Sequence, residues 1–133
     1  MWLLYSFIAL IIWGIWTIFF GLASKGGNYI QVSMLVVSVE FILSLIFVSL
    51  IYGFKPIDRR SLVFIFLAGV CGIIGMIMFS KACSVGKLSL VVPLTSAYPV
   101  IAVLYGVFVG ETLSKLQILG IISVIVGILL ISI

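Results

Sequence analysis

Apolar residues occupy long, nearly uncharged stretches of this 133-residue chain, and short polar segments separate them. A helix needs about 20 residues to cross the apolar core of a bilayer, which is roughly 30 Å thick. The stretches reach about that length without alternating apolar and polar positions, so they predict transmembrane helices and not the strands of a barrel. The predicted helices cover residues 2–24, 29–54, 61–83, 88–110 and 115–133.

The segments between the predicted helices are short and carry turn and capping residues. Residues 25–28 (Lys-Gly-Gly-Asn) form a tight turn, and Asp58 stands where it can cap the next helix. Ser114 and Gln117 have the spacing of a capping box. Because short connections make consecutive helices antiparallel neighbours, we predict a single all-α membrane domain over residues 1–133, an up-and-down bundle of five transmembrane helices.

Composition places the chain among membrane proteins, with 65% hydrophobic and 8% charged residues. Its basic residues are scattered singly without a basic stripe, so we expect a lipid bilayer and no nucleic acid as partner. Histidine is absent, and Cys71 and Cys83 would lie about 18 Å apart on one helix, too far for a disulfide. We expect no metal, no cofactor and no enzyme activity.

Basic residues near helix ends give a weak indication of orientation. The side of the N-terminus receives four and the other side three, namely Lys55, Arg59, Arg60 and Lys115 against Lys25, Lys81 and Lys87. Under the positive-inside rule this bias predicts a cytoplasmic N-terminus, in a prokaryotic inner membrane, and leaves insertion in both orientations open. The first helix lacks the basic flank of a signal peptide and is predicted to be retained.

Glu40 is the one acidic residue inside a predicted helix, within about 3 Å of the midpoint of residues 29–54. A carboxylate at that depth costs at least a few kcal/mol, which makes it a candidate site for a coupling proton or a cationic substrate. Ser33 and Ser44 share its helical face. The structural alternative is a protonated carboxyl that bonds to a neighbouring helix.

Pro99 lies at the middle of the fourth predicted helix, among the hydroxyls of Thr95, Ser96 and Tyr98. A proline there frees the carbonyl four residues earlier, that of Thr95, and kinks the helix. Freed carbonyls and hydroxyls at mid-membrane form binding sites in transporters. A plain packing kink is the alternative.

Tryptophans and a lysine complete the candidate site residues. Trp13 is at the centre of the first helix, where its indole N–H needs a partner, so it should face the bundle. Trp16 lies one turn further on. Aromatic rings suit apolar or cationic ligands, or simply fill the bundle core. Lys81 either attracts an anionic substrate or snorkels to the membrane surface. Gly106 and Gly110 form a GxxxG packing motif.

A set of short motifs runs from the first predicted helix to the last. They are Trp13-Gly14, then Ala82, Gly86, Ser89, Pro93-Leu94, Ser96 and Tyr98-Pro99, then Gly110-Glu111, Gln117, Gly120 and Gly127. In order and spacing they resemble the EamA-like domain of the drug/metabolite transporter superfamily, over essentially the whole chain.

The resemblance implies a five-helix unit equivalent to one repeat of a ten-helix transporter, whose halves are inverted around a central cavity. It places that cavity against the first four helices, including Trp13, Glu40 and residues 95–99, and gives Glu111 a structural role. The chain departs from the pattern in having one unit only and in the charge of Lys81, which leaves the assembly and the substrate charge open.

We therefore expect a half-size secondary transporter or exporter of a drug or metabolite that pairs with a second copy, parallel or inverted. No nucleotide-binding motif is present, so a proton or substrate gradient would drive it. The alternative is a non-transporting membrane subunit that assembles with or regulates a larger complex. An intramembrane enzyme ranks third, because it would need a nucleophile–base set or paired carboxylates.

Overall fold

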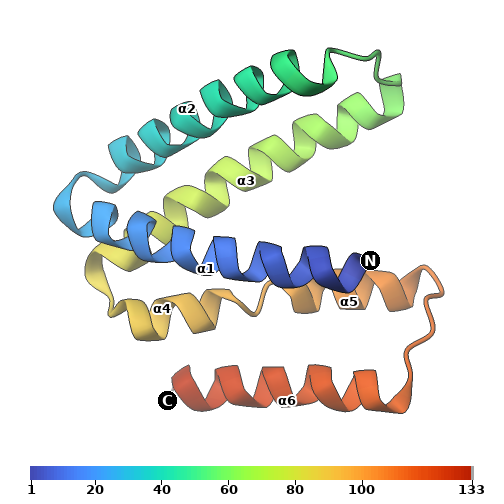
Figure 1. Cartoon of the computed structure of the whole chain (residues 1–133). Helices are drawn as coiled ribbons and strands as arrows, with labels where there is room; N and C mark the ends of the chain where they lie inside the picture. The colour runs from blue at the N-terminus through green and yellow to red at the C-terminus, as the bar shows by residue number, and fades with distance from the viewer. Residues whose placement is uncertain (133) are drawn as a thin grey trace. The chain divides into compact units, whose positions relative to one another are not determined.

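The computed structural model describes residues 1–132 as helices joined by short turns (Figure 1). The elements are α1 (Trp2–Gly26), α2 (Tyr29–Phe47), the π-helical turn η1 (Val48–Tyr52), α3 (Arg59–Val85), α4 (Leu88–Thr95), α5 (Pro99–Phe108) and α6 (Lys115–Ser132). No strand occurs in these residues, so the predicted all-α fold is confirmed. Ile133, the last residue of the fifth predicted helix, lies outside the described residues.

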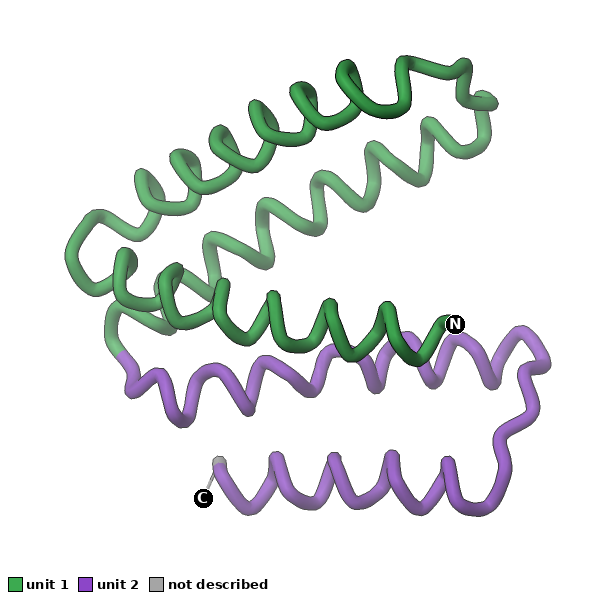
Figure 2. The backbone as a smooth tube through the Cα atoms, in the orientation of Figure 1, with its two compact units in different colours: residues 1–85 green, residues 86–133 purple. Residues whose placement is uncertain are grey.

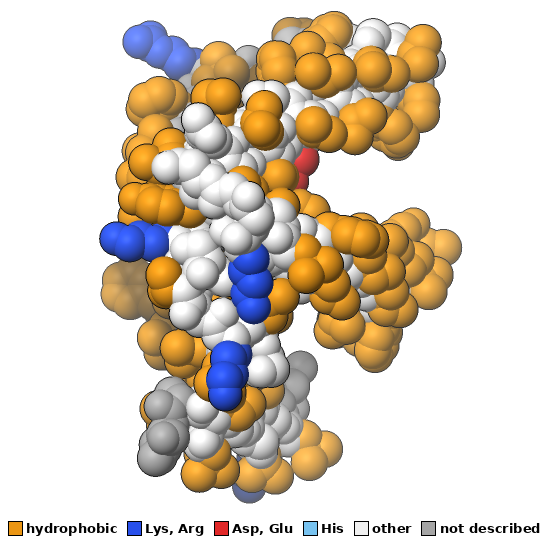
Figure 3. Space-filling model, turned by 90° about the vertical axis from the view of Figure 1, so that its left-hand side faces the viewer, with side chains coloured by type: hydrophobic (Ala, Val, Ile, Leu, Met, Phe, Trp, Pro, Cys, Tyr) orange, Lys and Arg blue, Asp and Glu red, His pale blue; other side chains and the backbone are white. Residues whose placement is uncertain are grey.

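Four helical segments are long and apolar enough to cross a membrane. They are Trp2–Gly26, Tyr29–Tyr52, Arg59–Val85 and Leu88–Phe108. The shortest has 21 residues, which at 1.5 Å per residue spans about 30 Å, the thickness of the apolar core. Lys115–Ile131 is also apolar but shorter. Hydrophobic side chains cover much of the surface in Figure 3, with Lys and Arg side chains projecting between them. The protein is therefore a multi-pass membrane protein.

Side chains cap the starts of three helices. The Asn28 carboxamide oxygen accepts the first free amides of α2, at 2.9 and 3.3 Å. Asp58 accepts the Ser61 amide over 2.9 Å at the start of α3, as predicted. Ser114 and Gln117 each accept the other's amide, at 2.8 and 3.3 Å, which confirms the capping box before α6. Because a capped start satisfies amides that the helix leaves free, these residues fix where the helices begin.

The fourth predicted helix is in fact two helices, α4 and α5, with Ser96–Tyr98 between them. Pro99 is the first residue of α5, a position that needs no amide hydrogen, so the proline begins a helix and does not kink one. The Tyr98 amide donates to the Thr95 carbonyl over 3.2 Å. The prediction of a free Thr95 carbonyl is therefore wrong, because a tighter turn replaces the missing α-helical bond.

The carbonyl that the break does expose belongs to Ser96. The Val100 amide would reach it in a continuous helix but instead donates to Ala97, over 3.0 Å. Within residues 1–132, no hydrogen bond reaches the Ser96 carbonyl oxygen.

The chain divides into two compact units, Met1–Val85 and Gly86–Ile133, which are described separately (Figure 2). In the first unit α3 packs against both α1 and α2. Its buried side chains all lie near the α1–α2 turn and the end of α3: Phe20, Ser24, Ser33, Ser80 and Cys83. From that end α1 diverges from α2 and α3 toward its N-terminus (Figure 1). In the second unit α4 packs against α6.

Candidate binding site around Glu40

Glu40 of α2 is joined to α1 by a hydrogen bond inside the first unit. The Trp16 indole Nε1–H donates to Glu40 Oε1 over 3.0 Å. Glu40 is exposed and Trp16 is half-buried. In the described part of the chain no basic side chain forms an ion pair with Glu40. The Trp16 hydrogen bond therefore holds the carboxyl in place at mid-helix, and a carboxyl group can accept further hydrogen bonds.

Trp16 belongs to a cluster of three nearly parallel rings. Its ring centroid lies 4.7 Å from that of Phe20 and 6.3 Å from that of Phe79 of α3, with interplanar angles of 19° and 13°. Phe20 and Phe79 are 5.5 Å apart at 15°. Such offset stacking stabilises aromatic pairs beyond their burial. We call Glu40, Trp16, Phe20 and Phe79 the Glu40 site.

Small polar residues form a second buried group in the first unit. The hydroxyl oxygens of Ser24 and Ser80 are 2.8 Å apart, and both residues are fully buried. Ser24 also donates to the Phe20 carbonyl over 2.8 Å. A hydroxyl has one proton, so Ser80 donates to Ser24. Ser33, on the predicted face of Glu40, is fully buried here, and its hydroxyl donates to the Tyr29 carbonyl over 2.8 Å.

The other candidates of the first unit make different contacts. Trp13, which was expected to face the bundle, is 61% exposed. The helix that carries it, α1, diverges from α2 and α3 toward its N-terminus (Figure 1). The tryptophan that faces the other helices of the unit is Trp16. Ser44 is exposed, and its hydroxyl donates to the carbonyl of Phe41 over 2.8 Å. The Lys81 ammonium lies 5.8 Å from the centre of the Tyr29 ring, a cation–π contact.

The remaining candidates belong to the second unit, at the break between α4 and α5. The Thr95 hydroxyl donates to the Val91 carbonyl over 2.8 Å, and the Ser96 hydroxyl to that of Val92 over 2.7 Å. Tyr98 is 61% exposed. These hydroxyls keep their acceptor lone pairs, so the break offers oxygen atoms beside the unpaired Ser96 carbonyl.

Glu111 follows a turn that ends α5. The Glu111 amide donates to the Gly106 carbonyl over 2.9 Å, and the Gly110 amide to that of Val107 over 3.1 Å. This is a Schellman motif, and Gly110 supplies its left-handed residue with a φ of 94°. The Glu111 side chain folds back over Gly106, so that a Cβ there would lie 2.7 Å from Oε2. In this unit the two glycines of the predicted GxxxG motif therefore have separate roles. Gly110 ends α5, and Gly106 leaves room for the Glu111 side chain.

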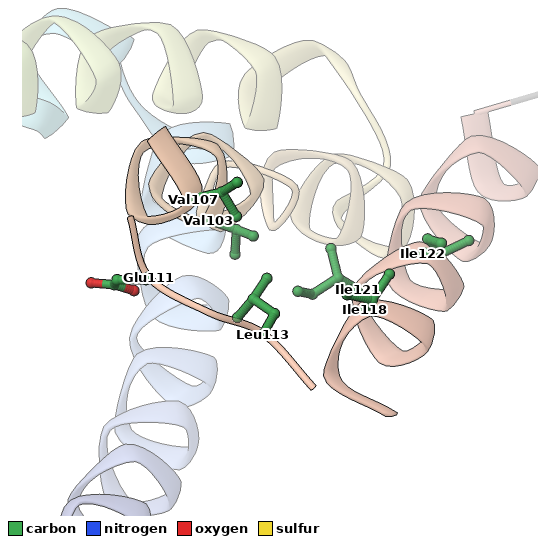
Figure 4. Close-up of a pocket in the computed structure, with 7 residues that line it drawn as sticks. All are labelled: Val103, Val107, Glu111, Leu113, Ile118, Ile121 and Ile122. Carbon is green, nitrogen blue, oxygen red and sulfur yellow. The ribbon is translucent and has the colours of Figure 1, made fainter. Parts of the chain in front are cut away.

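An open cavity of about 300 Å³ lies between α5 and α6 in the second unit. Its lining is apolar except at one edge, where Glu111 lies (Figure 4): Val103, Val107, Glu111, Leu113, Ile118, Ile121 and Ile122. Because it offers one carboxyl and no second polar group, the cavity has little means to orient a polar solute.

The Glu40 site combines a carboxyl group with flat apolar surfaces. Sequence reasoning selected Glu40 and Trp16 but missed Phe20 and Phe79. Phe20 stands four residues after Trp16, on the same helical face, and this spacing was available as a signal. Phe79 had no such signal, because its role depends on how α3 packs against α1.

An uncharacterized protein of Methanocaldococcus jannaschii is 39% identical over 77 residues, which cover 57% of this chain and 56% of that protein. The chain thus matches little more than half of the relative's length. No solved structure matches the chain.

A family model supplies the assignment. The model of the EamA-like transporter family matches residues 1–133. It confirms the resemblance seen in the motifs, and the chain belongs to the EamA-like transporter family.

Proposed function

We propose that this protein is a secondary transporter or exporter of a small drug-like molecule or metabolite, driven by a proton or substrate gradient. The observation that carries the proposal is its membership of the EamA-like transporter family over residues 1–133. The geometry adds support, because an exposed carboxyl beside aromatic rings is suited to solute binding and not to packing alone.

In this proposal α6 is the fifth transmembrane helix. Its 18 residues span about 27 Å at 1.5 Å per residue, a few ångströms less than the bilayer core. Local thinning of the bilayer accommodates such a mismatch at a modest cost. The N-terminus would face the cytoplasm, in a prokaryotic inner membrane.

Glu40 is proposed as the coupling or cation-binding group, with Ser33 and Ser44 on its helical face. Trp13 and the break at residues 95–99 would shape the same pathway. Lys81, already engaged with Tyr29, would tune the charge at one end of it. No step of this cycle involves covalent chemistry.

A second copy is proposed to complete the pathway, in parallel or inverted arrangement. One five-helix unit offers few helices to enclose a path with two gates. Native mass measurement in mild detergent should show a dimer. A monomer that still transports would remove this part of the proposal.

The decisive experiment is reconstitution of the purified protein in liposomes with a pH gradient. A panel of cationic, neutral and anionic solutes would be offered, with empty liposomes and an unrelated membrane protein as controls. Gradient-dependent uptake of one class is expected. Folded protein that moves none of them would favour a non-transporting subunit of a larger complex.

A further inference from the structure

No positively charged side chain within residues 1–132 forms an ion pair with Glu40. Its hydrogen bond comes from a neutral indole, over 3.0 Å. On α3, the Lys81 ammonium is directed to the Tyr29 ring and forms no ion pair with Glu40. Within residues 1–132 the site therefore holds a carboxylate with spare acceptor positions and no cation, which favours a positively charged occupant.

The rings of the site favour a second property of the ligand, a flat aromatic group. Trp16 and Phe79 are half-buried and nearly parallel, at 13°. A flat ring can stack on surfaces of this kind, and a cationic ring gains from the negative faces of the indole and phenyl groups. The Trp16 hydrogen bond joins the two requirements, since it places the carboxylate at the edge of an aromatic face.

We propose that the Glu40 site binds aromatic organic monocations, with the charge beside Glu40 and the ring against Trp16 and Phe79. This inference rests on the proposed transport function and names its substrate class. A bare metal ion fits poorly, because hard cations need several oxygen ligands and this site supplies one carboxyl among rings. An anion would be repelled by the Glu40 carboxylate, which has no cationic partner among the described residues.

The test is a direct binding measurement on the purified full-length protein in detergent, by calorimetry at a mildly alkaline pH. Four probes separate the requirements: N-methylquinolinium (ring and charge), quinoline (ring alone), tetramethylammonium (charge alone) and naphthoate (ring and negative charge). We expect N-methylquinolinium to bind about tenfold more tightly than quinoline or tetramethylammonium, and naphthoate to bind weakest.

Variants assign the effect to residues. Glu40→Gln should bring N-methylquinolinium and quinoline to similar affinities, while Asp58→Asn, which alters a carboxyl outside the spans, leaves their ratio unchanged. Trp16→Ala should weaken both aromatic probes by about tenfold, and Trp2→Ala is its matched control. Because the four probes are first compared on the wild-type protein, the proposal stays testable if a variant fails to fold.

Equal affinity of the wild-type protein for quinoline and N-methylquinolinium, or tighter binding of naphthoate, would overturn the inference. The binding measurement needs no gradient, so it separates the two proposals. Cation binding without uptake of any solute by liposomes would support the proposed binding site and contradict the proposed transport function. Uptake of an anion or a neutral solute, with no cation binding, would support the proposed transport function and contradict the proposed substrate class.

Discussion

Glu40 and Glu111 are chemically identical side chains in opposite circumstances. Glu40 stands in the middle of α2 and is held by a side chain of another helix, the Trp16 indole. Glu111 follows the end of α5, and its carboxylate folds back onto Gly106 of the same helix. One carboxyl thus connects two helices at membrane depth, and the other covers the last turn of its own helix.

The difference teaches what keeps each acid in place. Glu111 is tied to a local motif, because its amide, the left-handed Gly110 and the small Gly106 belong to one turn. Any α5 with the same turn would place it similarly. Glu40 has no local motif, and its position depends on how α1 packs against the other helices. An ionisable group that tertiary structure alone holds at membrane depth is the stronger functional candidate.

The largest predicted effect separates the two acids in transport. Glu40→Gln keeps the size and the acceptor oxygen for Trp16 but removes the ionisable group, so uptake driven by a pH gradient should be lost. Glu111→Gln should retain most of the uptake. The measurement is initial uptake into liposomes across a range of pH, at matched amounts of folded protein.

Two results would break the comparison. A Glu40→Gln protein with normal, still pH-dependent uptake would remove Glu40 from the mechanism. Equal losses in both variants would mean that Glu111 acts in transport and not only at the helix end.

The next effect concerns stability at the Glu111 turn. Gly110→Ala places a Cβ on a residue with a φ of 94°, which should cost about 1–2 kcal/mol. Gly106→Ala is the matched control, since its Cβ meets only the flexible end of Glu111 and alanine favours the helix by about 1 kcal/mol. Unfolding in detergent should show a loss for Gly110→Ala and no loss for Gly106→Ala. Equal losses would mean that the Glu111 carboxylate cannot move.

A smaller effect is expected at the Glu40 hydrogen bond. Trp16→Phe keeps a ring for Phe20 and Phe79 but removes the indole donor, which should cost about 1 kcal/mol, the range of an interhelical bond in a membrane protein. Trp2→Phe, at an exposed position near the start of α1, should change nothing measurable. Should both variants unfold alike, the Trp16–Glu40 bond adds no stability, and Glu40 is positioned by backbone packing alone.

The sequence predicted those features that depend on neighbours along the chain. Asp58, Ser114 and Gln117 act as predicted, because caps involve residues three apart. Long apolar stretches likewise predicted helices. The break after Thr95 was only half predicted, since proline shows where an amide is missing but not which carbonyl finds another donor. The new donor to the Thr95 carbonyl is the Tyr98 amide, which the turn at Tyr98 brings within reach.

Contacts between helices were harder to predict. Nothing in the sequence pairs Ser24 with Ser80, or brings Phe79 against Trp16, because uniformly apolar helices carry no strong inward face in their pattern. Trp13 was expected to face the bundle because of its central position in the first helix, yet it is 61% exposed. The partner of Trp13 stays a prediction, as does the meeting of Glu40 with the break at residues 95–99.

The smallest predicted effect concerns Asp58, an acid with only a capping role. It is a reference against which the effects at Glu40 and Glu111 can be compared. Asp58 is fully exposed, and hydrogen bonds from the Ser61 side chain and then its amide hold the pKa of Asp58 below its ordinary value. A lowered pKa in the folded state means that the cap stabilises the protein fully above the unfolded value of about 3.9 and loses this contribution as the pH falls through the folded pKa. Asp58→Asn keeps the acceptor oxygen without titrating. The melting temperature of the wild type in detergent should therefore exceed that of Asp58→Asn slightly at neutral pH, and the difference should vanish in acid. A difference that does not vary with pH would show that the charge of Asp58 contributes nothing and that its oxygen alone caps α3.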